Sequence, residues 1–212
     1  MNWLQYDSGF MKVMDKISKI AIVNILFLFT CIPVFTIGMA LEGMYGSLIK
    51  WIWEKDDRVF HNYIQSIREG WGKAEIGFGI LVGIAGILVM EIKIAGSMPV
   101  AGKYICTWIA CVTGICVFIT GLYYFPLVTM GKRKVYELIT ISFAGGVKCL
   151  LYTLLLTLLL GIEIFAFTLT VKLLPIWITV GFAGFGYIQA QIYLWVFEKI
   201  GVVKRNREGE KE

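Results

Sequence analysis

The chain has 212 residues, of which 58% are hydrophobic and 17% are charged, and its mean hydropathy is +0.75. Because a soluble domain is usually about 45–50% apolar and about 25% charged, this composition excludes an ordinary soluble domain and predicts a protein embedded in the lipid bilayer. The net charge of +5 does not predict a nucleic-acid partner, because the Lys and Arg residues lie in short segments between apolar blocks.

The first apolar block, Ile20–Leu41, is interrupted by Pro33, and the segment from Pro33 to Gly38 has the composition of a turn followed by a helix start. Two alternatives follow. Either one proline-kinked span runs through the block, or two shorter spans, Lys16–Ile32 and Thr36–Trp53, form a hairpin. In the second case Pro33, Thr36 and Gly38 make the turn.

Two polar connections have the period of an amphipathic helix lying along the membrane surface. The first carries apolar side chains at Phe60, Tyr63, Ile64, Ile67 and Trp71, and the second carries them at Tyr136, Ile139, Phe143 and Val147. Ser142 and Gly146 are in register with Ser66 and Gly70. This pattern fits either a diverged internal repeat, 36–98 and 104–171, or two independent helices that follow the same amphipathic rule.

Four later blocks have the length of a membrane span, which needs about 20 apolar residues. They are Ile76–Met98, Tyr104–Met130, Val147–Val171 and Pro175–Phe197. Loops on the cytoplasmic side carry an excess of Lys and Arg. Six spans place 17 of the 20 Lys and Arg residues on one side of the membrane, whereas five spans place 14 there. We therefore expect an all-α polytopic bundle of six transmembrane helices, with five as the alternative, and both termini in the cytoplasm.

Polar side chains inside the predicted spans are candidate functional groups. Glu163 lies near the centre of its span, Glu42 lies in the first two turns of another, and Asn24 lies in the first. An ionisable group in lipid costs about 2.5–3.5 kcal/mol on insertion scales and marks a candidate proton or substrate path. The alternative for each carboxyl group is a protonated form that hydrogen-bonds a neighbouring helix.

Glycines recur on single helix faces. Gly79, Gly83 and Gly86 share a face of the Ile76–Met98 block, and Gly181 and Gly184 share a face of the last block. Small residues let membrane helices approach closely. We expect these glycines to pack helices within the chain, with contact to a second copy as the alternative.

No catalytic or metal-binding pattern is found. All Asp residues lie outside the predicted spans, the single histidine, His61, lies on the polar side of an amphipathic segment, and the five cysteines form no CxxC pair. We therefore expect no enzyme activity and no cofactor.

The segment Cys31–Gly38, with Asn24–Phe27 before it and Met44-Tyr45 after it, resembles the YesL-like family of uncharacterised bacterial multi-pass membrane proteins. Tyr123–Leu127, followed by a basic turn, is similar to the second half of that family. The resemblance implies a bacterial plasma membrane protein without an assigned activity. The association of the family with carbohydrate uptake operons implies an accessory role near a sugar ABC transporter.

We therefore expect a single helical membrane domain, residues 1–198, followed by a charged cytoplasmic tail, 199–212. One functional hypothesis is a non-enzymatic accessory or partner subunit of carbohydrate or solute uptake that docks through its two amphipathic segments. The other is a small proton-linked transporter that uses Glu163. The sequence indicates no solute, partner or oligomeric state.

Overall fold

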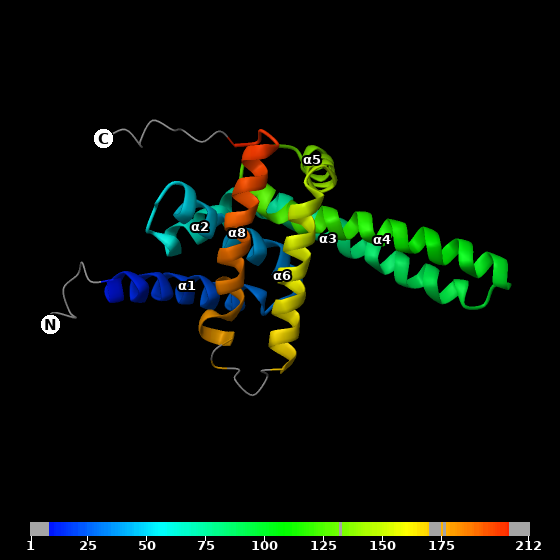
Figure 1. Cartoon of the computed structure of the whole chain (residues 1–212), viewed down its shortest axis with the longest axis horizontal. Helices are drawn as coiled ribbons and strands as arrows, with labels where there is room; N and C mark the ends of the chain where they lie inside the picture. The colour runs from blue at the N-terminus through cyan, green and yellow to red at the C-terminus, as the bar shows by residue number, and fades with distance from the viewer. Residues whose placement is uncertain (1–8, 132, 170–174, 176, 204–212) are drawn as a thin grey trace.

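The computed structural model describes residues 9–131, 133–169, 175 and 177–203, and this part of the chain is all-α, as predicted (Figure 1). Two short helical turns are η1 (Val34–Thr36) and η3 (Trp177–Gly181). Seven α-helices lie within the described residues: α1 (Gly9–Cys31), α2 (Ile37–Trp53), α3 (Val59–Ala95), α4 (Val100–Val128), α5 (Val135–Lys148), α6 (Leu150–Leu169) and α8 (Phe182–Lys199).

Three of these helices, α3, α4 and α6, are long and apolar enough to cross a membrane, which indicates a multi-pass membrane protein. They correspond to the predicted spans Ile76–Met98, Tyr104–Met130 and Val147–Val171, the last of which ends outside the described residues. Six spans are not shown, because α1, α2 and α8 are not among the candidate spans of the described chain. The fourth predicted span, Pro175–Phe197, is divided between η3 and α8.

The long helices do not form one parallel bundle. In Figure 1, α6 and α8 run side by side and upright, whereas the antiparallel pair of α3 and α4 extends sideways and its distal half projects beyond the other helices. Apolar side chains on this projection are exposed, among them Met90 (66%) and Trp108 (71%). These side chains have no protein surface to pack against, so their burial requires lipid or a partner.

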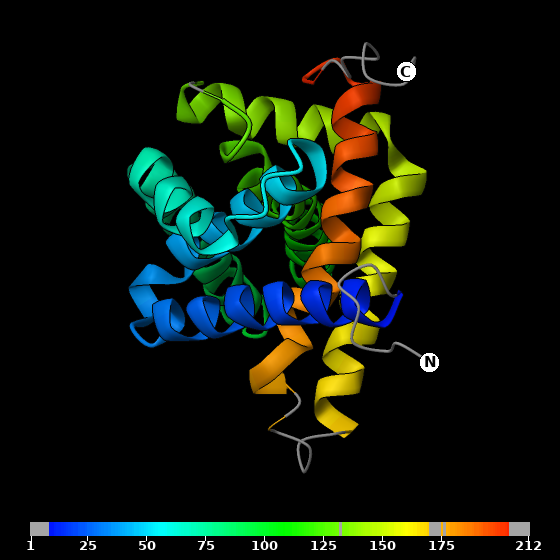
Figure 2. The same cartoon turned by 90° about the vertical axis from the view of Figure 1, so that its left-hand side faces the viewer.

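The turn at Pro33 separates two helices, since α1 ends at Cys31 and α2 begins at Ile37. The Thr36 hydroxyl shares its one proton between the backbone carbonyls of Thr30 and Pro33, which stabilises the turn. Figure 2 shows α2 turning back over α1. The structure therefore has two helices here, as in the hairpin alternative, rather than one kinked helix.

The first amphipathic segment is not a separate helix. Residues 60–71 form the first turns of α3, which continues unbroken into the predicted span because no residue between Trp71 and Ile76 interrupts its hydrogen bonding. The second segment is separate, because the backbone at Cys149 leaves the helical region between α5 and α6. The expectation of two separate surface helices was therefore wrong for the first segment.

The core contains tyrosines from several helices. Tyr193 contacts Tyr45 and Tyr123 edge-to-face, with ring centroids 5.5 and 5.6 Å apart. Their hydroxyls are paired, since Tyr193 donates to the Leu122 carbonyl at 2.7 Å and Tyr123 lies 3.0 Å from the Thr153 hydroxyl. These hydrogen bonds offset the cost of removing the tyrosine hydroxyls from water.

The predicted glycine faces differ from one another. At Gly79, Gly83 and Gly86, no described atom lies within 4 Å of the position that a Cβ would take, so this face packs against nothing in the described chain. Gly181 lies against the Trp177 ring, and Gly184 is next to Val180. The expected packing within the chain is therefore not seen on α3, where the distal part of the helix lies in the projection.

Candidate functional site

Asn24 connects α1 to the start of α8. Its side-chain amide donates to the carbonyls of Trp177 and Ile178 at 2.8 and 2.7 Å, and its Oδ1 accepts a hydrogen bond from the Ala183 N–H at 2.8 Å. Asn24 is fully buried. With every side-chain polar atom engaged by the backbone of another segment, Asn24 holds helices together.

Glu163 belongs to a short polar chain inside the protein. Gln189 donates to Glu163 Oε2 at 3.3 Å, and the Tyr45 hydroxyl donates to Gln189 Oε1 at 2.6 Å. Gln189 thus uses both ends of its amide to connect α6 with α2. The carboxyl group of Glu163 therefore has a hydrogen-bond partner within the chain.

Glu42 has a different environment. Its side chain is 1% exposed, and its Oε2 has no hydrogen-bond partner within the described residues. The carboxyl group lies against Gly70 of α3, where a methyl group on Gly70 would overlap Oε1. A buried polar atom without a partner is costly, so it is either a defect of packing or part of a binding site.

Ser66 has the same property and lies beside Glu42. It is 4% exposed, and its hydroxyl has no partner in the described part of the chain. Gly46 of α2 leaves room for this hydroxyl, because a Cβ at that position would overlap it. Glycines on both helices therefore give space to two polar groups, rather than only bringing the backbones together.

Both groups line a cavity of about 540 Å³ between α2, α3 and the end of α4. Its polar lining also includes the charged side chains of Lys50, Glu69 and Lys73 and the hydroxyl group of Thr129. Ligand sites commonly combine a volume of about 300–1,000 Å³ with a few converging polar groups. This cavity is the candidate functional site.

The second half of the chain contains the same helix contact without the carboxyl group. Gly146 of α5 is approached by Ile119 of α4 much as Gly70 is approached by Glu42, and Ser142, like Ser66, is buried with an unpartnered hydroxyl among the described residues. An apolar side chain therefore fills the position of Glu42 in the second contact. Packing alone does not require a carboxyl group there.

The predicted docking residues are divided between surface and interior. Phe60, Trp71 and Tyr136 are 58, 60 and 63% exposed, and Phe143 is also exposed. Tyr63 is buried and donates a hydrogen bond to the Thr30 hydroxyl at 3.0 Å. Two residues are partly buried, and these are Ile67 and Ile139. The surface that these helices offer is therefore aromatic and does not include Tyr63.

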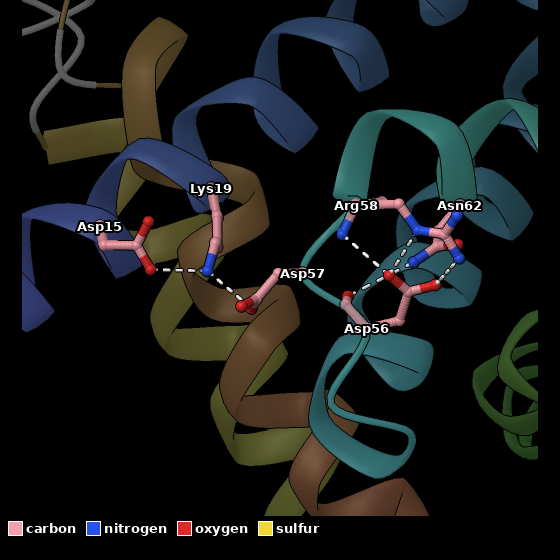
Figure 3. Close-up of polar contacts among 6 residues, drawn as sticks. All are labelled: Asp15, Lys19, Asp56, Asp57, Arg58 and Asn62. Atoms are coloured by element: carbon pink, nitrogen blue, oxygen red, sulfur yellow. Dashed lines mark hydrogen bonds and ion pairs between the residues drawn. The ribbon is translucent and has the colours of Figure 1, made fainter.

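Ionic contacts at the start of α3 attach it to α1 (Figure 3). Lys19 Nζ lies 2.6 Å from a carboxylate oxygen of both Asp15 and Asp57. Asp56 accepts hydrogen bonds from the backbone N–H and side chain of Arg58 at 3.0 Å, and these bonds hold the pKa of the Asp56 carboxyl well below its usual range. Exposed pairs of this kind add little stability, and they orient the connection between α2 and α3.

No cluster of three or more His, Cys, Asp or Glu side chains suited to a metal ion is found in the residues that the structure describes. The cavity itself brings only Glu42 and Glu69 together, with two lysines beside them. This arrangement disfavours a cation held by oxygen ligands, since both lysines would repel it.

One comparison with known proteins gave a match. Residues 20–92 match a family described as "Protein of unknown function, DUF624". The matched segment includes the second half of α1, all of α2 and most of α3, and it contains the cavity residues Glu42, Ser66 and Lys73. No curated protein and no solved structure matched the chain.

The sequence singled out Glu42 but not Ser66, Lys50 or Lys73 as site residues. Charged residues between spans were assigned to topology alone, and a single serine in an amphipathic helix is usual. A signal was nevertheless present, because Ser66 and Gly70 are in register with Ser142 and Gly146. In both helices a serine lies four residues before a glycine, and this recurrence marks the closely packed face of each helix.

Proposed function

We propose that the protein is a non-enzymatic membrane subunit that binds a partner within the bilayer as an accessory to solute uptake. The observation that carries the proposal is the open glycine face of α3, formed by Gly79, Gly83 and Gly86. In lipid, helices associate through small residues that allow close packing. A glycine face on a spanning helix that meets no helix of its own chain fits a helix of another chain.

The position of this face supports the same proposal. It lies on the half of α3 that projects with α4 away from the other helices (Figure 1). A partner helix can therefore approach without displacing α6 or α8. Phe60 and Trp71, exposed at the other end of α3, offer further contact area to a partner or to lipid headgroups.

The link to carbohydrate uptake depends on the resemblance of Cys31–Gly38 and its flanking residues to the YesL-like family. In this proposal the partner is a membrane subunit of a sugar ABC transporter, and the protein lies in a bacterial plasma membrane with both termini in the cytoplasm. The 17 Lys and Arg residues expected on one side of the membrane support that orientation.

The experiment is copurification in mild detergent with mass spectrometry. We expect the native protein to retain a membrane subunit of a transporter and Gly83→Leu to lose it, because the larger side chain prevents close helix approach. Val112→Leu is the matched control, since it adds bulk at an exposed position of α4. Recovery of the same partner with Gly83→Leu would contradict the proposed surface, and a partner without a role in transport would contradict the uptake role.

The proton-linked transporter that uses Glu163 is less well supported. Glu163 accepts a hydrogen bond from Gln189, so its carboxyl group has a structural explanation within the chain. Among the described residues, the buried carboxyl oxygen without a hydrogen-bond partner is Oε2 of Glu42.

A further inference from the structure

The cavity between α2, α3 and the end of α4 has features of a ligand site that membrane anchoring and partner binding do not explain. It contains two polar atoms, Glu42 Oε2 and Ser66 Oγ, that are more than nine-tenths buried and have no partner among the described residues. Both are hydrogen-bond acceptors, although the hydroxyl can also donate. A ligand that enters the cavity and donates hydrogen bonds would satisfy both.

The charges of the lining restrict the ligand further. Burial favours the neutral form of the Glu42 carboxyl group, whereas an ammonium group placed against it would favour the charged form. With such a group bound, Glu42 and Glu69 are matched by Lys50 and Lys73, and the lining carries two groups of each sign. A simple anion has no N–H or O–H group to donate to Glu42 Oε2, and a simple cation would be repelled by the two lysines. The balanced lining therefore fits a ligand that carries both charges, with an ammonium group for Glu42 and an anionic group for the lysines.

The ammonium end has suitable acceptors. An ammonium group has three N–H donors, and the cavity offers Glu42 Oε2, Ser66 Oγ and Thr129 Oγ1. The Thr129 hydroxyl already donates to the Pro126 carbonyl at 2.8 Å, which leaves its lone pairs free to accept. Lysine ammonium groups bind phosphate as point charges, so Lys50 and Lys73 suit a phosphate at the other end.

The position of the cavity along α3 indicates where such a ligand is found. Ser66, Gly70 and Lys73 come just before Ile76, where α3 changes from a charged segment to a long apolar one. That change places the cavity at the level of the lipid headgroups. Zwitterionic ammonium phosphates are concentrated at this level as aminophospholipid headgroups.

We infer that this cavity binds an ammonium–phosphate zwitterion of the phosphoethanolamine class, with the ammonium group on Glu42 and Ser66 and the phosphate on Lys50 and Lys73. The chemistry is shared by the headgroup of phosphatidylethanolamine and by free phosphoethanolamine. The cavity is separate from the open glycine face of α3. The inference about its ligand therefore does not depend on the proposed partner.

A helix contact in the second half of the chain indicates that Glu42 can be replaced without loss of the fold. Ile119 occupies against Gly146 the position that Glu42 occupies against Gly70. An uncharged side chain is therefore compatible with this helix contact. Replacement of Glu42 should remove the acceptor of the ammonium group while the helices remain packed.

The test uses the full-length protein, purified in detergent and stripped of lipid, with binding measured directly by calorimetry. The probes are dihexanoyl-phosphatidylethanolamine, free phosphoethanolamine, and the phosphatidylcholine and phosphatidylglycerol analogues of the same chain length. We expect the two ethanolamine probes to bind and the other two to bind at least about tenfold more weakly, because choline has no N–H donor and glycerol has no positive charge. A larger affinity for the dihexanoyl lipid than for phosphoethanolamine identifies the lipid headgroup as the source, and equal affinities identify the free zwitterion.

Variants locate the binding. Glu42→Gln and Lys73→Gln should each weaken binding of dihexanoyl-phosphatidylethanolamine by about tenfold or more. Glu163→Gln is the matched control, because Glu163 is a carboxyl group outside the cavity that has its own hydrogen-bond partner, Gln189. If Glu42→Gln does not fold, Ser66→Ala replaces it with the same expectation. Native affinity in Lys73→Gln and in the folded variant at position 42 or 66, or equal binding of the choline and ethanolamine lipids, would overturn the inference.

Discussion

The carboxyl group of Glu42 occupies the space that a side chain at position 70 would fill. Gly70 lies on α3 and Glu42 on α2, and the absence of a Cβ on Gly70 allows the buried carboxyl group to lie directly against the α3 backbone. The cavity therefore requires glycine at position 70. We expect a substitution at Gly70 to affect stability differently from substitutions at the other glycines of α3.

Gly70→Ala should destabilise the protein, because its methyl group would displace the Glu42 carboxyl group from a closely packed contact. Overpacking of this kind typically costs about 1–3 kcal/mol. The measurement is thermal unfolding in detergent. Gly79→Ala is the control, because the Cβ would meet open space, and Ala in a helix is favoured over Gly by about 0.5–1 kcal/mol. Equal effects of the two substitutions would contradict the packing at Gly70.

Glu42→Ile should leave the protein folded and at least as stable as the native chain. The corresponding contact in the second half is made by Ile119, and the substitution removes a buried carboxyl oxygen that has no partner in the described chain. Replacing a buried charged group by an apolar one of similar size is often neutral or stabilising. Unfolding temperatures of the two proteins test this, and a loss of more than about 2 kcal/mol would show that the carboxyl group is needed for the fold.

The helices were predictable from the sequence because the apolar segments are long. Which of these helices could span the membrane was harder to predict. After Lys19, α1 offers only Ile20–Cys31 as an uncharged stretch, and α2 has 17 residues, or about 25 Å of helix. Both fall short of the roughly 20 apolar residues that cross a bilayer. Charge counting favoured six spans because it weighs loops rather than the lengths of the helices between them.

The candidate cavity was predictable only in part. Glu42 was identified as a polar residue in an apolar segment, but its place in one cavity with Ser66 and Lys73 depends on the angle at which α2 crosses α3, which no local pattern specifies. Tyr63 shows the same limit. Its position on the apolar face of an amphipathic helix predicted contact with a partner or with lipid. In the structure Tyr63 is instead buried, and its hydroxyl donates a hydrogen bond to the Thr30 hydroxyl of α1.

Asn24→Ala should destabilise the protein by about 2–3 kcal/mol, because it removes the hydrogen bonds that the Asn24 side chain makes with the carbonyls of Trp177 and Ile178 and with the Ala183 N–H. Trp177 and Ala183 are buried, so water does not readily replace the lost bonds. Thermal unfolding in detergent again gives the measurement. The control is Gln191→Ala on the exposed side of α8, where we expect a change within about 0.5 kcal/mol. A small effect at Asn24 would mean that α1 does not hold the start of α8.

Glu163→Gln separates the proposed subunit from the proton-linked transporter. The amide oxygen of Gln can accept the same hydrogen bond from Gln189, so we expect stability to change by less than about 1 kcal/mol. Copurification of the partner should also be unchanged, because Glu163 is not part of the glycine face of α3. The decisive measurement is solute uptake by proteoliposomes under an imposed proton gradient, with Asn24→Asp as a control for perturbation of the polar interior. Uptake that the native protein supports and that only Glu163→Gln abolishes would contradict the subunit proposal, because a group that merely hydrogen-bonds Gln189 has no need of a titratable proton.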